Sequence, residues 1–332
     1  MSEPKKITDA FGRVHEYLRI SLTDRCNLRC TYCMPAEGIV LRDKSEFMTS
    51  EEIIEIASTF VKMGVKKIRL TGGEPLIKKD IVNILTQLSQ LPIELTLTTN
   101  AVLVDKHIDT FKNVGMKSLN VSLDSLKAER MNAISRREYF ARIIANIDLL
   151  IESEIDVKLN VVLMKGVNDD EILDFIEYTK FNKVDVRFIE FMPFSGNEWD
   201  RSKMVSLQEI LDVANEQFPS IQKLEEKPNF TSRNYRVDGY VGTFGVISTV
   251  SNPFCDSCNR IRLTADGKVK NCLFSAEESD LLTQLRKGDD IRPVIRAAVA
   301  SKKEKLAGMD SFETEQGKEI FSKNRSMISI GG

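Results

Sequence analysis

Residues 23–35 read TDRCNLRCTYCMP and place Cys26, Cys30 and Cys33 in the spacing C-x3-C-x2-C. Three thiolates are one fewer than the four that usually hold an iron–sulfur cluster, so a four-iron cluster here would keep one iron without a protein ligand. A metal with an open position can bind and activate a small molecule. The stretch therefore indicates a reaction centre, with a disulfide plus a spare thiol, or part of a zinc site, as the alternatives.

The other three cysteines form a second compact group, Cys255-x2-Cys258 and then Cys272 after thirteen intervening residues. The chain has two histidines, His15 and His107, and neither follows this group. Structural zinc normally takes four Cys or His ligands. Two three-thiolate clusters therefore fit the pattern better than two zinc sites, and a three-cysteine zinc site completed by a carboxylate or water is the alternative for this group.

Length and composition set the general class of the protein. A chain of 332 residues can bury one large core, or one large and one small domain. The net charge of −2 does not indicate a nucleic-acid or membrane partner, and no apolar run approaches the ~20 residues that span a bilayer. The N-terminus MSEPKKITDAFGR lacks the apolar core of a signal peptide. We expect a soluble cytoplasmic protein with reduced thiols rather than a disulfide framework.

Strand-like and helical patterns alternate along the first two thirds of the chain. The β-rich runs are 17–22, 67–70, 94–98, 118–123, 157–163 and 184–191. The helical patterns between them are 49–64, 80–90, 105–113, 139–152 and 169–181. In the first helix, Thr49 and Glu52 have capping-box spacing, and Gly64 marks the end. Six β-α units in series predict an α/β protein with a parallel sheet, either a barrel or a doubly wound sheet.

The strands alternate apolar and polar residues with period two. In the first strand, for example, Leu18 and Ile20 oppose Arg19. Such alternation usually indicates an antiparallel sheet with one solvated face, but the helices between the strands must cover the apolar face. The polar face then lines the inside of a curved sheet, with Arg19, Arg69 and Lys158 pointing inward. Burying three cations needs compensation, which a large anionic ligand would supply.

The second strand ends in TGGEP, residues 71–75. Two glycines let the backbone approach a ligand and expose its N–H and C=O groups. The motif is neither a Walker loop nor G-x-G-x-x-G, and a plain turn between strand and helix would also explain it. Its position one strand after the cysteine triad favours a ligand site.

The C-x3-C-x2-C motif after the first strand, followed by GGEP after the second, resembles the radical S-adenosylmethionine enzymes. The finer resemblance is to the GTP 3′,8-cyclases of molybdenum-cofactor biosynthesis, in LRISLTDRCNLRCTYCMP, KIRLTGGEPL, LTTN, LNVSLD, VRFIEFMP, FCDSCNRIRLTADGK and the terminal SMISIGG. It runs from about Asp9 to Gly332. It implies an incomplete (β/α)6 TIM-like barrel over residues 9–225. A smaller C-terminal α+β domain over 226–332 would carry a second iron–sulfur cluster and a Gly-Gly tail.

The resemblance also implies a role for each matching residue. Two 4Fe–4S clusters would be held, one by Cys26, Cys30 and Cys33 and the other by Cys255, Cys258 and Cys272. S-adenosylmethionine would be bound by Tyr32, Gly73, Ser122 and Met192. GTP would be bound by Arg19, Arg69, Thr98, Lys158, Arg260, Ile261 and Arg262, with its guanine on the second cluster. A flexible tail would reach the active site with Gly331 and Gly332.

The implied reaction is internal to GTP. Reductive cleavage of S-adenosylmethionine gives a 5′-deoxyadenosyl radical, which removes the C3′ hydrogen of the ribose. The C3′ radical then attacks C8 of guanine, and one electron and one proton complete (8S)-3′,8-cyclo-7,8-dihydroguanosine 5′-triphosphate. A reductant must supply the electrons, and a cyclic pyranopterin monophosphate synthase would receive the product. The resemblance further implies a homodimer, with neither nucleic acid nor membrane as a partner.

Two positions carry separate expectations. Ala101 follows TTN where the family usually has glycine, and alanine costs on the order of 1 kcal/mol if that turn needs a positive φ. Glu190, on the last predicted strand, is a candidate donor of the proton that completes the product. A structural salt bridge between Glu190 and a neighbouring arginine is the alternative role.

Two other functions stay open at this point. One is a different radical enzyme with an auxiliary cluster, such as a peptide-modifying enzyme, although these generally carry more cysteines downstream. The other is a non-enzymatic zinc-binding or nucleic-acid-binding module. The near-neutral charge and the expected polar interior of the sheet argue against that module.

Overall fold

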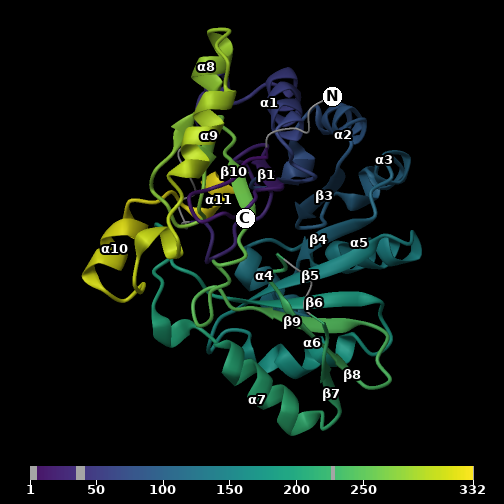
Figure 1. Ribbon diagram of the computed structural model, residues 1–332. Helices are drawn as coiled ribbons and strands as arrows, with labels where there is room; N and C mark the ends of the chain where they lie inside the picture. Colours follow the sequence, from purple (N-terminus) through teal and green to yellow (C-terminus); the bar gives the residue numbers. More distant parts are fainter. Residues whose placement is uncertain (1–5, 35–41, 226–228, 332) are drawn as a thin grey trace.

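A computed structural model describes residues 6–34, 42–225 and 229–331 (Figure 1). Its twelve strands are β1 (Tyr17–Ser21), β2 (Lys67–Thr71), β3 (Glu94–Thr99), β4 (Ser118–Ser122), β5 (Asp156–Leu163), β6 (Val184–Glu190), β7 (Ile221–Lys223), β8 (Arg233–Val237), β9 (Thr243–Ile247), β10 (Arg260–Leu263), β11 (Lys268–Lys270) and β12 (Ser279–Asp280). All twelve belong to one sheet, in the order β12-β11-β10-β1-β2-β3-β4-β5-β6-β9-β8-β7.

The central part of this sheet is parallel, as predicted. Strands β1 to β6 lie side by side in sequence order, and each pairs in parallel with the next. The last third of the chain extends both edges, because β10 joins β1 and β9 joins β6, again in parallel. Antiparallel strands complete the two edges. The fold is therefore mixed α/β with one large, mainly parallel sheet.

The helices occupy the intervals between strands and the C-terminal part. They are α1 (Ser50–Lys62), α2 (Ile81–Ser89), α3 (Ile108–Asn113), α4 (Ala128–Ser135), α5 (Phe140–Glu152), α6 (Ile172–Tyr178), α7 (Leu207–Gln217), α8 (Leu282–Arg286), α9 (Arg292–Ala300), α10 (Glu315–Ser322) and α11 (Met327–Ile330). The five predicted helices are all present, and two of them begin with a 3-10 turn instead of an α-helix. Helix α4 was not predicted, because few of its side chains are apolar and buried.

The first helix shows the predicted capping box. The Thr49 side chain accepts a hydrogen bond from the Glu52 amide at 3.3 Å, and the Glu52 carboxylate accepts one from the Thr49 amide at 2.8 Å. Glu52 also pairs with Arg286 at 2.7 Å, which ties α1 to α8. Among the described residues, no helix has both the length and the apolar content needed to cross a bilayer.

The two faces of the parallel strands divide as the alternation predicts. Leu18 and Ile20 are fully buried in the main core, whose other side is covered by the helices. Arg19 has the opposite orientation, and its backbone lies in register with Arg69 on one side and Arg262 on the other. Three arginines on three adjacent strands therefore project from the same face.

A second, smaller core lies under the C-terminal part. It consists of Phe194, Phe274, Leu306, Met309, Phe312 and Ile330, and Cys255 and Cys272 pack against it. Since Ile330 belongs to α11, this core anchors the end of the chain. Figure 1 shows α11 beside β1 and β10.

Candidate active site

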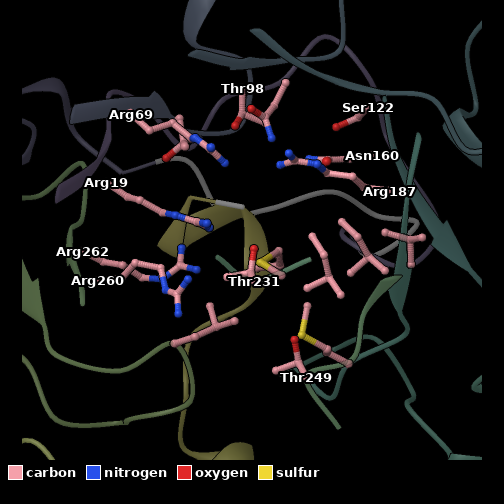
Figure 2. Close-up of a pocket in the computed structure, with 18 of the residues that line it drawn as sticks. Arg19, Arg69, Thr98, Ser122, Asn160, Arg187, Thr231, Thr249, Arg260 and Arg262 are labelled. Carbon is pink, nitrogen blue, oxygen red and sulfur yellow. The ribbon is translucent and has the colours of Figure 1, made fainter. Parts of the chain in front are cut away.

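One cavity of about 520 Å³ brings the two cysteine groups together. All six cysteines line it, although the two groups are more than 200 residues apart in sequence. The polar face of β1 to β6 and the start of β10 form much of its wall, and Figure 2 shows side chains from this wall. Its volume is within the range of small-molecule sites.

The TGGEP motif packs directly against the loop that carries the first cysteines. The Gly73 amide donates to the Thr23 carbonyl at 2.7 Å, and a Cβ atom on Gly73 would lie 2.2 Å from the Arg25 carbonyl oxygen. A Cβ atom on Gly72, whose φ is +150°, would lie 2.6 Å from the Thr23 carbonyl oxygen. The two glycines are therefore needed to seat the cysteine loop, and Gly73 also lines the cavity.

Glu74 of the same motif is a site residue that sequence reasoning missed. Its buried carboxylate accepts hydrogen bonds from the Thr99 hydroxyl at 2.8 Å and the Asn100 amide at 2.8 Å. Burial raises the pKa of Glu74 to about 7. The Asn100 side chain in turn donates to the Cys26 sulfur at 3.7 Å. Glu74 thus fixes the end of β3 against the cysteine loop, and its place in GGEP was the available signal.

The first three cysteines line the cavity as free thiols. All six cysteines are free thiols, so the disulfide alternative is not confirmed. Burial raises the pKa of Cys26 to about 11, that of Cys33 to about 12 and that of Cys30 well above its usual range. Iron binds the thiolate, so loading this site must release protons. In the described part of the chain, no three His, Cys, Asp or Glu side chains are placed to hold a single metal ion.

The second cysteine group lies in a more electropositive setting. Burial disfavours the thiolate of Cys258, but the charges of Arg260 and Lys302 outweigh this effect and lower its pKa to about 6. The Lys302 ammonium donates to the Cys258 sulfur at 3.3 Å. A ready thiolate on the cavity wall fits iron ligation.

The residues expected to bind S-adenosylmethionine all line the cavity: Tyr32, Gly73, Ser122 and Met192. The Tyr32 hydroxyl donates to Asp124 at 2.8 Å, and the Val162 amide donates to the other Asp124 oxygen at 2.9 Å. Burial raises the pKa of Asp124 to about 6. Sequence reasoning missed Asp124, although it closes the LNVSLD motif. It holds Tyr32 in place beside the first cysteines.

The cations predicted to bind GTP also converge on the cavity: Arg19, Arg69, Lys158, Arg260 and Arg262. Thr98 lines it too. Figure 2 shows Arg19, Arg260 and Arg262 grouped on one side, with Arg187 and Asn160 across the cavity. Arg187 was missed, although it alternates with buried Val186 and Phe188 on β6 as the rule for the other strands predicts. Its partner is Asp185 at 2.6 Å.

The cavity is electrostatically incomplete without an anion. Burial, together with Arg187, Lys67 and Arg69, lowers the pKa of Lys158 to about 8, and burial lowers that of Arg69 to about 10. Several buried polar atoms of its lining have no hydrogen-bond partner among the described residues: Tyr17 Oη, Arg19 Nε, Arg69 Nε, Asn120 Oδ1, Asn160 Oδ1, Asn259 Oδ1 and an Arg260 guanidinium nitrogen. Unpaired buried polar groups are costly, so the cavity fits a large, polar, anionic ligand.

Ile261 differs from its predicted neighbours. Its side chain is buried in the main core, where its strand pairs with Leu18, whereas Arg260 and Arg262 line the cavity. The Ile261 side chain therefore does not line the cavity. Any contact between this position and a nucleotide would come from the backbone.

The end of the chain reaches the same arginines. The Gly331 carbonyl accepts a hydrogen bond from Arg262 at 2.6 Å. Gly331 has a φ of +83°, and a Cβ atom there would lie 2.5 Å from the Thr71 hydroxyl and 2.9 Å from the Ser21 Cβ. Only glycine fits this place between β1 and β2. Gly332, the other predicted tail residue, lies outside the described residues.

A polar network fastens the segment that precedes the tail. Arg325 makes a two-pronged contact with Asp266, at 2.8 and 2.9 Å, and also pairs with Glu278. The Asn324 side chain donates to the Leu273 carbonyl at 3.0 Å, next to Cys272. The tail is thereby tied to the loop of the second cysteine group.

Glu190 does not line the cavity. Its buried carboxylate accepts hydrogen bonds from the amides of Leu207, Val250 and Ser251 and from the Ser251 hydroxyl. Its partners are thus backbone amides and the Ser251 hydroxyl, not the arginine that the structural alternative named. A Glu190→Gln variant would test the stability of the loop at Val250 and Ser251 rather than proton transfer.

Ala101 has the backbone conformation that the family glycine suggested. Its φ is +62°, and it is fully buried. The Asn146 side chain donates to its carbonyl at 2.7 Å and holds the turn in place. The turn therefore retains its shape with alanine, at the expected strain of about 1 kcal/mol.

Comparison with protein families and curated proteins agrees with this geometry. The Radical SAM superfamily matches residues 20–179, and the Molybdenum Cofactor Synthesis C family matches residues 184–307. "GTP 3′,8-cyclase, mitochondrial" of Arabidopsis thaliana is 46% identical over 98% of this chain and 83% of its own length. "GTP 3′,8-cyclase" of Listeria monocytogenes is 41% identical, over 98% of this chain and 99% of its own.

Other relatives are longer proteins. "Molybdenum cofactor biosynthesis protein 1" of Bos taurus is 46% identical over 98% of this chain, which spans about half (51%) of the bovine protein. Among solved structures, Streptococcus suis SuiB bound to S-adenosylmethionine superimposes with a TM-score of 0.63 over 96% of this chain and 72% of that one. At 16% identity, this similarity concerns the fold alone.

Proposed function

Because the chain belongs to the GTP 3′,8-cyclase family within the radical S-adenosylmethionine superfamily, we propose that it converts GTP to (8S)-3′,8-cyclo-7,8-dihydroguanosine 5′-triphosphate. This is the first step of molybdenum-cofactor biosynthesis. One observation carries the proposal most directly: two cysteine triads and a set of buried cations line the same cavity. A single ligand can therefore contact an iron site and a polyphosphate site at once.

The finer description of the fold is part of this proposal. Residues 9–225 form the radical core as an incomplete (β/α)6 barrel, and residues 226–332 form the part that carries the second cluster and the tail. The in-order parallel strands β1 to β6 support the first statement. The family matches, which change between residues 179 and 184, support a division into two functional parts but fall earlier than residue 225.

The first cluster is assigned to Cys26, Cys30 and Cys33, with S-adenosylmethionine beside it. When bound, this pair supplies the 5′-deoxyadenosyl radical that removes a hydrogen atom from the substrate. The protein's part is to hold and shield the reactants. Gly72 and Gly73 let the cysteine loop pack closely against β2, and Asp124 holds the Tyr32 ring beside the first cysteines.

GTP is assigned to the opposite half of the cavity, next to Cys255, Cys258 and Cys272. Arginine forks bind phosphate oxygens in pairs, and the cavity offers Arg187 in addition to the five predicted cations. Binding the triphosphate would satisfy the unpaired arginine nitrogens and relieve the repulsion between like charges. Residue Gly331 covers Arg262 from the tail side, where it helps to enclose the substrate.

Further parts of the proposal concern partners and location. We expect an external reductant, transfer of the product to a cyclic pyranopterin monophosphate synthase, and a homodimer. A cytoplasmic location also stays a prediction, since the Arabidopsis relative is named as mitochondrial. A peptide-modifying radical enzyme is the second candidate, because SuiB, which has also been solved with a precursor peptide, has a similar fold. The five arginines around one cavity favour a nucleotide triphosphate instead.

The proposal is tested by identifying the product. Anaerobically reconstituted protein is incubated with GTP, S-adenosylmethionine and reductant, and the mixture is analysed by chromatography and mass spectrometry. We expect a new compound with the mass of GTP but a different retention time, formed in equal amount with 5′-deoxyadenosine. GTP recovered intact, with 5′-deoxyadenosine formed regardless of whether GTP is added, would contradict the proposal.

A further inference from the structure

Lys302 is a buried cation that contacts the second cysteine group and does not line the cavity. It follows α9, and its amide is tied to the Val299 carbonyl at 3.1 Å. Lys302 is only 5% exposed. The ammonium donates to the Cys258 sulfur at 3.3 Å, the Cys258 carbonyl at 3.4 Å and the Arg260 carbonyl at 3.2 Å. The three acceptors lie where the cysteine loop runs into the start of β10.

The charge of Lys302 requires an anion at this place. Two of its acceptors are neutral carbonyls, so the sulfur is the acceptor that can carry a compensating charge. His15 does not add a second cation, because burial and the charge of Lys302 lower its pKa to about 4. The nearby carboxylate of Asp9 is already paired with Arg13 at 2.6 Å and with His15 at 3.1 Å. A thiolate at Cys258, free or bound to iron, would supply the negative charge that compensates Lys302.

A second cation fastens the same loop. Arg13 donates to the Cys255 carbonyl at 2.9 Å and, with the same guanidinium, to the carbonyls of Glu304 at 2.7 Å and Lys303 at 3.0 Å. The cysteine loop and the segment after α9 are thus joined by Arg13 and Lys302. Of these two, only Lys302 reaches a cysteine sulfur.

We infer that Lys302 is a positioning residue that holds Cys258 for the second cluster and raises the reduction potential of that cluster. Hydrogen bonds to cluster sulfurs and nearby charge set such potentials. A fixed positive charge stabilises the more negative, reduced form, so its removal must lower the potential. Arg260 flanks Cys258 from the cavity and is assigned to substrate, whose phosphates would neutralise its charge, whereas Lys302 does not line the cavity and keeps its charge whether or not the nucleotide is bound. This inference rests on the proposed function, which assigns a cluster to Cys258.

The test compares Lys302→Met, which keeps an apolar stem of similar length, with Lys302→Arg and wild type. Each full-length protein is reconstituted, its iron is counted, and the midpoint potential of the second cluster is measured by redox titration with electron paramagnetic resonance. Chains in which Cys26, Cys30 and Cys33 are alanine identify the signal of the second cluster. In Lys302→Met we expect the ratio of reduced to oxidised second cluster to fall about tenfold at a fixed potential, which is about 59 mV for a one-electron couple.

Lys305→Gln is the matched control. Lys305 lies near the same loop, but its side chain is 58% exposed and pairs with Asp256 at 3.8 Å. We expect no shift in this variant and a potential close to wild type in Lys302→Arg. Two full clusters with the same potential in Lys302→Met and Lys305→Gln would overturn the inference alone. Only about four iron atoms per wild-type chain, instead of about eight, would instead overturn the assignment of a second cluster.

Discussion

A Cys30→Ala variant is expected to lose about four of its eight iron atoms and all formation of 5′-deoxyadenosine. Cys30 is the central thiol of the first triad. Its carbonyl accepts a hydrogen bond from the Cys33 amide at 3.0 Å, and this turn positions Cys33. Two remaining thiolates would be too few to keep a cluster for which we propose three protein ligands. Iron analysis and chromatography of the reaction mixture measure the two losses, and the far-ultraviolet circular dichroism should stay unchanged.

Cys272→Ala is the matched variant in the other triad. It should also lose about four iron atoms, but it should still cleave S-adenosylmethionine, because the first triad and the residues around Tyr32 are intact. No cyclised nucleotide should form. If Cys30→Ala still produced 5′-deoxyadenosine, or if Cys272→Ala lost that activity while keeping the iron of the first site, the assignment of the two triads would be wrong.

A Gly331→Ala variant should lower the rate of product formation by about 5- to 30-fold. The positive φ of Gly331 costs alanine roughly 1–2 kcal/mol, and this corresponds to a 5- to 30-fold change in an equilibrium. The new methyl group would in addition lie 2.5 Å from the Thr71 hydroxyl, so the docked tail becomes less populated. The Arg262 contact would then be lost with it. Steady-state kinetics with GTP measure the effect on kcat.

Ser329→Ala is the control within the same tail. Ser329 is partly exposed on α11. Within the described residues, the one hydrogen bond of its hydroxyl is with the Ser326 hydroxyl at 3.3 Å. This variant should retain the wild-type rate, and both variants should keep their full iron content. A Gly331→Ala protein with wild-type kcat would show that the docked position of the tail has no part in the reaction.

The sequence predicted the parts of the site that follow from local periodicity. Arg19, Arg69 and Lys158 were placed in the interior because they alternate with buried apolar residues on their strands, and all three line the cavity. Arg187 obeys the same rule on β6 and was missed only because that strand was not divided into faces. Strands β1 to β6 and five of the eleven helices of the described chain were likewise visible as patterns of 2 and 3.6 residues, whereas α4 and the helices after β6 were not predicted.

The parts that were missed depend on contacts between distant segments. Asp124 matters because it meets Tyr32, which lies 92 residues earlier in sequence. Lys302 meets Cys258 across 44 residues. The Gly72-Gly73 pair was assigned to ligand approach, whereas its close neighbours are the carbonyls of the cysteine loop. The pairing of β10 with β1 could not be predicted from local patterns either, because the periodicity of a short strand does not specify which strand it pairs with.

The most direct test of the central claim uses GTP deuterated at C3′. Reduced, reconstituted protein is incubated anaerobically with this substrate and S-adenosylmethionine, and the 5′-deoxyadenosine is analysed by mass spectrometry. A gain of one mass unit is the predicted result, since the radical would take its hydrogen from C3′ of a nucleotide held by the cavity arginines. Unlabelled 5′-deoxyadenosine, formed equally without GTP, would contradict the account and leave a radical enzyme with another substrate.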